Sequence, residues 1–199
     1  MDPHAPAIEF VEPHCDIVER LRAVPPTAHV RGLAFGTITE ALRRAGLLDA
    51  YRARFEHGLR YESLALYPLT EYMVRLASAA AFLYTPETVY EGIGEISRMN
   101  AVESIKSLLG QTLLHELASE PRHLLEQGLA MRRQVYKYGR WELCAHAPQH
   151  VEVRYFDEFV WIRQACTYAA IGAFESCRIR PRITTTLDTP YTGSTHFRW

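Results

Sequence analysis

The 199-residue chain has few cysteines, almost no net charge and no long apolar run. The gaps between its four cysteines include no CxxC pair and match neither a zinc ribbon nor a dense disulfide framework. We therefore expect four reduced thiols in a cytoplasmic protein, at Cys15, Cys144, Cys166 and Cys177. The net charge of -1 excludes a global field that would steer the chain onto nucleic acid or an anionic membrane.

Targeting and membrane segments are not expected either. The stretch MDPHAPAIEF has no basic start and no apolar core, so we expect no secretory signal. The most apolar stretch, Leu69–Tyr84, is too short to cross a bilayer and contains Glu71 and Arg75. It predicts a buried helix and no membrane span. The 48% hydrophobic content is typical of a globular protein that folds without a metal or disulfide.

Apolar residues at helical spacing, with capping residues and glycine stops, predict helices up to about residue 138. The expected helices cover residues 15–24, 36–46, 47–58, 69–84, 85–99, 100–119 and 120–134. The first 14 residues contain three prolines and are expected to be irregular. We expect residues 1–27 to be an N-terminal extension with a short helix, and residues 28–199 to be a single domain.

The segment LLHELASEPRH begins like a zinc-protease helix at His115 and Glu116. That signature needs a second histidine four residues after the first, but Ser119 stands there and Glu120-Pro121 predicts a new helix start. A metalloprotease site is therefore not expected. Glu116 falls within the apolar stripe of the helix and His115 at its flank. Either Glu116 is solvated at a fraying helix end, or it is a polar group inside a ligand pocket.

After Tyr138-Gly139 the apolar period changes from helical to two, which predicts strands. Strands over 140–147 and 150–156 form a hairpin, and Asp157 caps a helix over 158–174. Strands over 177–187 and 194–199 follow, with Pro181 indicating an edge or a bulge. The predicted fold is α+β, an N-terminal helical bundle packed on a C-terminal antiparallel ββαββ unit.

Period two also predicts a basic face on the last two strands, suited to an anionic ligand or an acidic partner. Its members are Arg178, Arg180, Arg182, Arg198 and His196. The alternative is a solvated face neutralised by nearby carboxylates, those of Glu142, Glu152 or Glu175.

Residues with catalytic or metal-binding patterns are not found. There is no GxSxG elbow and no cysteine in a catalytic context, and the nine histidines are expected to be lone surface or otherwise satisfied residues rather than metal ligands. The many aromatic residues either fill a plain core or line an apolar cavity between helices and sheet. The candidate ligand-binding residues are Glu116, His115, Trp141, Tyr155 and Tyr168. The sequence names no cofactor.

The order of four segments, VRGLAFGTITEALRRAGL, LYPLTEYM, ETVYEGIGEI and STHFRW, resembles a known family. It is a large paralogous family of proteins of unknown function, expanded in myxobacteria, and the resemblance covers about residues 28–199. Its layout is similar to a superfamily of haem-based nitric-oxide sensors, vinyl-reductase domains and TRAPP subunits. The resemblance implies small-molecule sensing or protein docking, often as dimers.

One departure from that superfamily concerns haem. Its haem-binding members hold the porphyrin propionates with a tyrosine-x-serine-x-arginine motif. Tyr61 and Ser63 begin such a motif here, but Ala65 stands in place of the arginine. The resemblance therefore implies another hydrophobic ligand rather than haem.

These observations favour a non-enzymatic sensing or regulatory domain with an apolar pocket between helices and sheet, signalling through a homodimer or a protein partner. The alternative is a docking module of the TRAPP-subunit type without an internal ligand. A third reading, an enzyme on a hydrophobic substrate, requires convergent polar groups in the pocket, such as Glu116 and His115.

Overall fold

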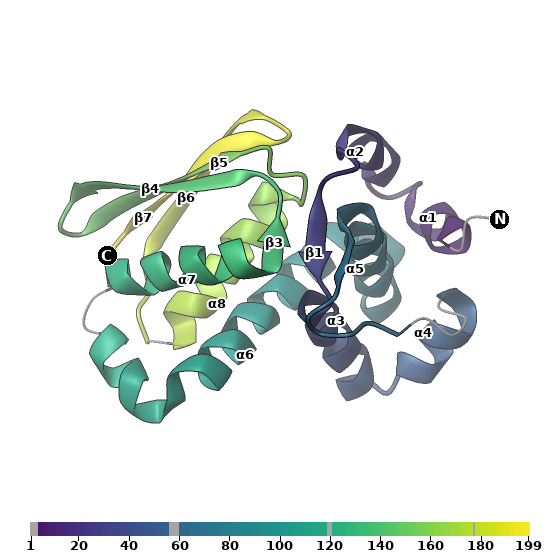
Figure 1. Ribbon diagram of the computed structural model, residues 1–199, viewed down its shortest axis with the longest axis horizontal. Coiled ribbons are helices and arrows are strands. Elements are labelled where there is room, and N and C mark those ends of the chain that lie inside the picture. Colours follow the sequence, from purple (N-terminus) through teal and green to yellow (C-terminus); the bar gives the residue numbers. More distant parts are fainter. Residues whose placement is uncertain (1–3, 56–59, 119–120, 177) are drawn as a thin grey trace. The chain divides into compact units, whose positions relative to one another are not determined.

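The computed structural model describes the backbone of residues 4–55, 60–118, 121–176 and 178–199, and the side chains of residues 4–55, 60–105, 122–176 and 178–199. Helices and two antiparallel sheets make up the chain (Figure 1), which confirms the predicted α+β class. The chain divides into two compact units. The first contains Met1–Ile96 and Val135–Tyr138, and the second contains Ser97–Gln134 and Gly139–Trp199.

The first unit is mainly helical. Its helices are α1 (Ala5–Val11), α2 (Ile17–Ala23), α3 (Leu33–Arg44), α4 (Leu48–Phe55), α5 (Leu69–Leu83), the 3₁₀ turn η1 (Pro86–Thr88) and the first part of α6 (Val89–Ala118). Helix α5 is buried on nearly all sides, as its apolar run predicts. Among the described residues, no helix combines the length and the apolar character that crossing a membrane requires.

Two expectations for this unit were wrong. Residues 5–11, expected to be irregular, form the helix α1, with Pro6 in its first turn and Ala7 and Val11 buried. The helices expected over 85–99 and 100–119 are the one continuous helix α6. Residues 97–103 contain neither glycine nor proline, so nothing interrupts the helix there.

A small antiparallel sheet, in the order β2-β1-β3, completes the first unit. Its strands are β1 (His29–Arg31), β2 (Leu66–Pro68) and β3 (Tyr136–Lys137). None of the three was predicted, because two or three residues are too few to display a period of two. Only the pairing of distant segments makes these residues strands.

The second unit is the predicted ββαββ arrangement with helices on one face. Its elements are the end of α6, α7 (Pro121–Val135), β4 (Arg140–Ala147), β5 (His150–Phe156), the π-helical turn η2 (Ile162–Cys166), α8 (Thr167–Ser176), β6 (Arg182–Thr189) and β7 (Thr192–Arg198). The sheet order is β4-β5-β7-β6, antiparallel throughout. Helices α7 and α8 lie under one face of this sheet (Figure 1). The expected helix break after Ala118 is confirmed, since α7 starts at Pro121.

The face of the sheet turned toward these helices carries the core of the second unit. Val151, Val153 and Tyr155 alternate along β5, and Phe197 continues the layer on β7. Leu124, Leu125 and Leu129 of α7 and Ile162, Cys166 and Phe174 of η2 and α8 pack against them. Burial of these side chains, each contributing about 1.5–3 kcal/mol, holds the helices on the sheet.

Two boundaries in this unit differ from the predictions. The strand expected over 177–187 begins at Arg182, because α8 ends in a Schellman turn. Ile179 N–H donates to the Phe174 carbonyl, and Arg178, at φ 59°, donates to that of Glu175. The helix expected over 158–174 begins at Ile162, because Glu158 is drawn into an interior cluster described below.

Candidate functional site

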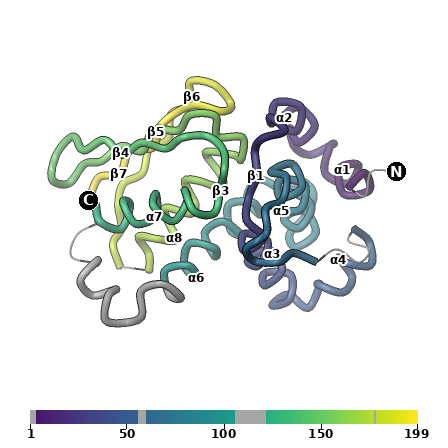
Figure 2. The backbone as a smooth tube through the Cα atoms, viewed as in Figure 1, coloured from purple at the N-terminus to yellow at the C-terminus, as the bar shows by residue number. Residues whose placement is uncertain are grey.

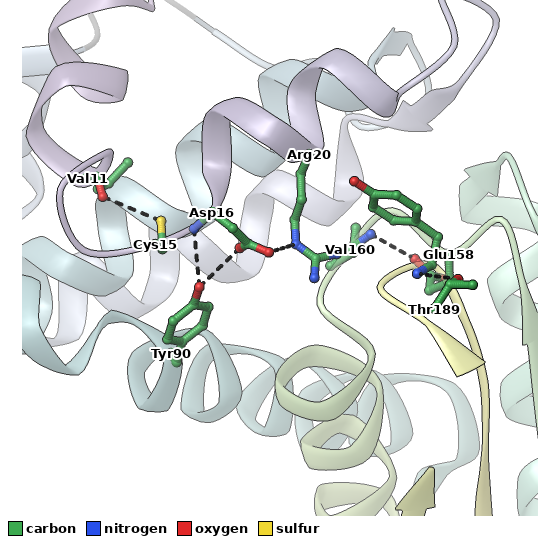
Figure 3. A network of polar contacts seen from close by, with 9 residues as sticks. Val11, Cys15, Asp16, Arg20, Tyr90, Glu158, Val160 and Thr189 are labelled. Atoms are coloured by element: carbon green, nitrogen blue, oxygen red, sulfur yellow. Dashed lines mark hydrogen bonds and ion pairs between the residues drawn. The ribbon is translucent and has the colours of Figure 1, made fainter. Parts of the chain in front are cut away.

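A buried charged cluster lies where α7, β4 and the segment after β5 meet. Glu158 is 1% exposed, and its carboxylate accepts hydrogen bonds from Arg132 of α7 (2.9 Å) and from the Trp141 indole N–H of β4 (2.6 Å). The Val160 backbone N–H donates to its other oxygen at 3.1 Å, as Figure 3 shows. A buried carboxylate is stable only when paired in this way, so the cluster fixes three elements relative to one another.

Trp141 is the centre of this cluster. The Arg132 guanidinium lies over its ring at 4.6 Å, and Tyr155 meets the ring edge-on at 4.9 Å. The cation–π contact and the aromatic pair each add attraction to the hydrogen bond that the indole donates. Trp141 itself is only half-buried, so one part of this site faces outward.

A chain of hydroxyl groups crosses the helix-facing side of the sheet from the same place. The Tyr155 hydroxyl is hydrogen-bonded to the Thr195 side chain. The Thr195 and Thr185 hydroxyl oxygens are hydrogen-bonded at 3.0 Å, and those of Thr185 and Thr167 at 2.7 Å. Burial raises the pKa of Tyr155 well above its usual range, so this hydroxyl stays protonated. The chain ends at Thr167, where the π-helical turn η2 passes into α8. Turns of this type are frequent at functional sites.

Around these polar groups the core is apolar and incompletely covered. Several hydrophobic side chains that pack against it remain partly exposed, and we refer to them as the apolar rim: Trp141, Leu143, Ala170, Ala173, Ile179, Ile183, Leu187 and Trp199. Interiors of this kind, apolar with a few placed polar groups, are typical of ligand sites.

The predicted ligand-binding residues are distributed as follows. Trp141 and Tyr155 are in contact, and Tyr168 is half-buried on α8. The side chains of His115 and Glu116 lie outside the described residues. Arg132 and Glu158 were missed, because a buried ion pair between residues 26 positions apart leaves no periodic signal in the sequence.

Of the residues predicted to form a basic face, some lie on the last two strands and others precede them. Arg182 and Arg198 stand opposite each other on β6 and β7, whereas Arg178 and Arg180 precede the strand. His196 faces Glu152 across β5 and β7, on the side of the sheet away from α7 and α8. Burial alone would raise the pKa of Glu152, but hydrogen bonds from Arg154, His146 and Ser194 lower it to about 2.

The first unit has a polar cluster of its own (Figure 3). Asp16 forms an ion pair with Arg20 at 2.8 Å, and the Tyr90 hydroxyl donates to its other oxygen at 3.1 Å. This cluster joins α2 to α6 and is fully satisfied, so it serves the packing of the first unit. A surface depression on the same unit, lined by Arg43, Gly46, Leu48 and Asp49, contains none of the predicted site residues.

Solved structures with the same fold include several H-NOX proteins. A point mutant of the H-NOX protein from K. algicida, in the unliganded Fe(II) state, has a TM-score of 0.62 at 13% identity, covering 84% of this chain and 95% of that one. The H-NOX protein from S. oneidensis in the Fe(II)NO state has a TM-score of 0.54 at 11% identity, covering 84% and 98%. At such identities the likeness shows the fold alone.

The described residues do not fit a haem. The nearest further match to the tyrosine-x-serine-x-arginine motif is Tyr136, Tyr138 and Arg140, with a tyrosine in the serine position. The Arg140 side chain is 65% exposed, pairs with Glu142 at 3.1 Å and covers the Phe156 ring. No histidine among the described side chains is buried enough to be an enclosed axial ligand.

The profile of one family, described as "Protein of unknown function (DUF2378)", matches residues 23–166. No curated protein matches the sequence.

Proposed function

Because the chain belongs to the DUF2378 family of proteins of unknown function, we propose its function from the site itself. The protein is a non-enzymatic sensing or regulatory domain that binds a small apolar molecule between the sheet of the second unit and helices α7 and α8. It acts in the cytoplasm and signals through a second copy of the chain or another protein. The fold it shares with H-NOX domains is consistent with such a role.

The observation that carries this proposal is the position of Trp141. Its half-buried ring adjoins the partly open apolar rim, while its N–H is bound to the buried Glu158. A ligand with an apolar body packs on the rim and displaces the indole. Glu158 then keeps Arg132 and Val160 as its partners, so the charge stays compensated.

Displacement of Trp141 also provides a route for a signal. Arg132 lies on α7 and over the indole ring, so a shift of the ring changes the contacts that hold α7 to β4. The hydroxyl chain from Tyr155 to Thr167 extends the same site to α8. Two helices on the sheet thereby depend on the occupancy of one site.

Native mass spectrometry of the protein as purified from cells, beside the same sample denatured, tests the proposal. A native mass above a whole number of chains, lost on denaturation, is the expected result. The substitution Ala170→Phe fills the rim against α8 and is expected to remove the extra mass. Ala130→Phe, at an exposed position of α7, is the matched control and should keep it.

Bare chain masses in wild-type protein, or an extra mass that Ala170→Phe leaves unchanged while the protein stays folded, would contradict the proposal. A bound ligand should also stabilise the fold. At a concentration one hundred times its Kd it adds about 2.7 kcal/mol, which corresponds to a Tm increase of roughly 5–10 °C for a chain of this size.

A second candidate function is a docking module without an internal ligand. Three leucines favour it, since Leu33, Leu64 and Leu66 are 43%, 74% and 53% exposed near the β1–β2 pairing. The partner we propose for this surface is a second copy of the chain. Light scattering that finds a dimer in wild-type protein and a monomer in the Leu64→Ser, Leu66→Ser variant would support it, and a wild-type monomer would rule it out.

A further inference from the structure

Three histidines from three different strands come together on the face of the four-stranded sheet that α7 and α8 leave uncovered. His146 is on β4, His150 on β5 and His196 on β7, three neighbouring strands (Figure 2). Their ring centroids lie 4.8 to 5.9 Å apart. The carboxylate of Glu152 lies among them, on β5, which is the strand between β4 and β7.

The distances between the side chains suit a common ion. His146 Nε2 is 2.8 Å from Glu152 Oε2, and His196 Nε2 is 3.9 Å from Glu152 Oε1. One ligand atom from each of these three residues lies within 4.8 Å of the others. Around a tetrahedral zinc ion with bonds near 2.0–2.1 Å, ligand atoms are about 3.3 Å apart, so movements of roughly an ångström complete the site.

The backbone places His146 in this cluster through a β-bulge. Ala145 pairs with Val151 and Ala147 pairs with His150, so His146 is the extra residue of β4. A bulge bends its strand and redirects a side chain, and bulges recur next to functional sites. Glu152 and His196 need no such device, because they are direct partners in the β5–β7 register.

Two further residues orient the ligands in the manner of an outer coordination shell. His150 Nε2 is 3.1 Å from His196 Nδ1, which leaves His196 Nε2 directed toward Glu152. Arg154 holds the Glu152 carboxylate at 3.1 Å. In metal sites the second nitrogen of a ligand histidine is almost always bound in this way, and ligand carboxylates are themselves hydrogen-bonded.

From this arrangement we propose a binding site for a zinc-class divalent transition metal, formed by His146, Glu152 and His196. His150 is a positioning residue, and the fourth coordination position is open to solvent. Imidazole and carboxylate donors suit zinc and its neighbours, whereas magnesium and calcium prefer sites built from oxygen alone. The neighbouring Arg154 and Arg198 carry positive charge, which moderates the affinity for a cation. The bound ion joins β4, β5 and β7 at one end of the sheet.

Zinc titration of the full-length, tag-free protein by calorimetry tests this site, with cobalt absorption as a second readout. One ion per chain and a tetrahedral cobalt spectrum are expected. His146→Ala, Glu152→Gln and His196→Ala should each lower the affinity at least about tenfold, since losing even an outer-shell partner costs that much. His150→Ala should weaken binding but keep the cobalt spectrum. His29→Ala, a half-buried histidine of the first unit, is the control and should leave the affinity unchanged.

His146 is exposed, so its alanine variant is expected to fold even if a change at the buried Glu152 prevents folding. Zinc should raise the Tm of wild-type protein and leave that of His146→Ala unchanged. No zinc or cobalt binding by the wild-type protein would overturn the proposal. So would equal losses in the His29 and His146 variants, which would indicate scattered adventitious binding.

Discussion

Replacing Glu158 by alanine is expected to be among the most destabilising single changes in the second unit. The carboxylate is 1% exposed and Arg132 is 8% exposed, so the substitution leaves a guanidinium buried without its counter-ion. Breaking one side of a buried ion pair costs about 3–5 kcal/mol. The Trp141 N–H and the Val160 N–H lose their acceptor as well.

Two further variants separate the loss of stability into the part due to the charge and the part due to the hydrogen bonds. Glu158→Gln keeps one acceptor oxygen, which Trp141 and Arg132 can share, but it removes the charge and turns an amide N–H toward the Val160 N–H, so it is expected to cost about 1–3 kcal/mol. The double variant Arg132→Met, Glu158→Leu removes both charges and should cost less than the sum of the two single changes.

Urea unfolding followed by circular dichroism measures these free energies, and an unchanged m-value shows that the same surface is exposed in each variant. Glu126→Ala is the control on α7, the helix of Arg132, because both side chains of the Arg122–Glu126 pair are exposed. It should cost less than about 1 kcal/mol. A Glu158→Ala variant no less stable than Glu126→Ala would refute the reasoning, since the cluster would then not be holding α7 to β4.

Three other predictions concern single residues. Burial raises the pKa of Tyr155 above its ordinary value of 10.0 in the folded state, so its contribution to stability is complete below about pH 10 and is lost as the pH rises further. Urea unfolding across that range should show a weaker alkaline decline for Tyr155→Phe than for wild-type protein, and equal declines would contradict this. Burial likewise raises the pKa of the Cys15 thiol to about 11, so its reaction with a disulfide reagent at neutral pH should be far slower in folded than in unfolded protein, as mass spectrometry of the labelled peptide can measure. A methyl group on Gly172 would lie 2.4 Å from the Arg98 carbonyl oxygen, so Gly172→Ala should cost about 1–3 kcal/mol by urea unfolding, whereas Gly128→Ala, where nothing lies within 4 Å, should be neutral or stabilising.

Much of the secondary structure was predictable because it rests on local periodicity. Helix α5 is predicted as a buried helix from its mostly apolar stretch, and β4 and β5 are predicted as a hairpin from alternation over eight and seven residues. The strands β1, β2 and β3 were not predictable, since they are too short to show a period.

Some residues of the candidate site were also predictable from the sequence, and others were not. Trp141 and Tyr155 could be placed on the core face of a sheet because alternation assigns a face to each residue of a strand. Their partners Arg132 and Glu158 could not, because a buried charge pair is decided by which helix end meets which loop.

The sequence by itself determined the α+β class, the ββαββ order and the end of α6 before Pro121, since these depend on periodicity and on capping within a few residues. Only the tertiary structure decided that Glu158 is buried beside Trp141 and that His146, Glu152 and His196 share one surface. The strand order and a single β-bulge set that second grouping. The strand order depends on the pairing of β5 with the distant strand β7, and the bulge lies within the β4–β5 hairpin at a position that simple alternation does not mark.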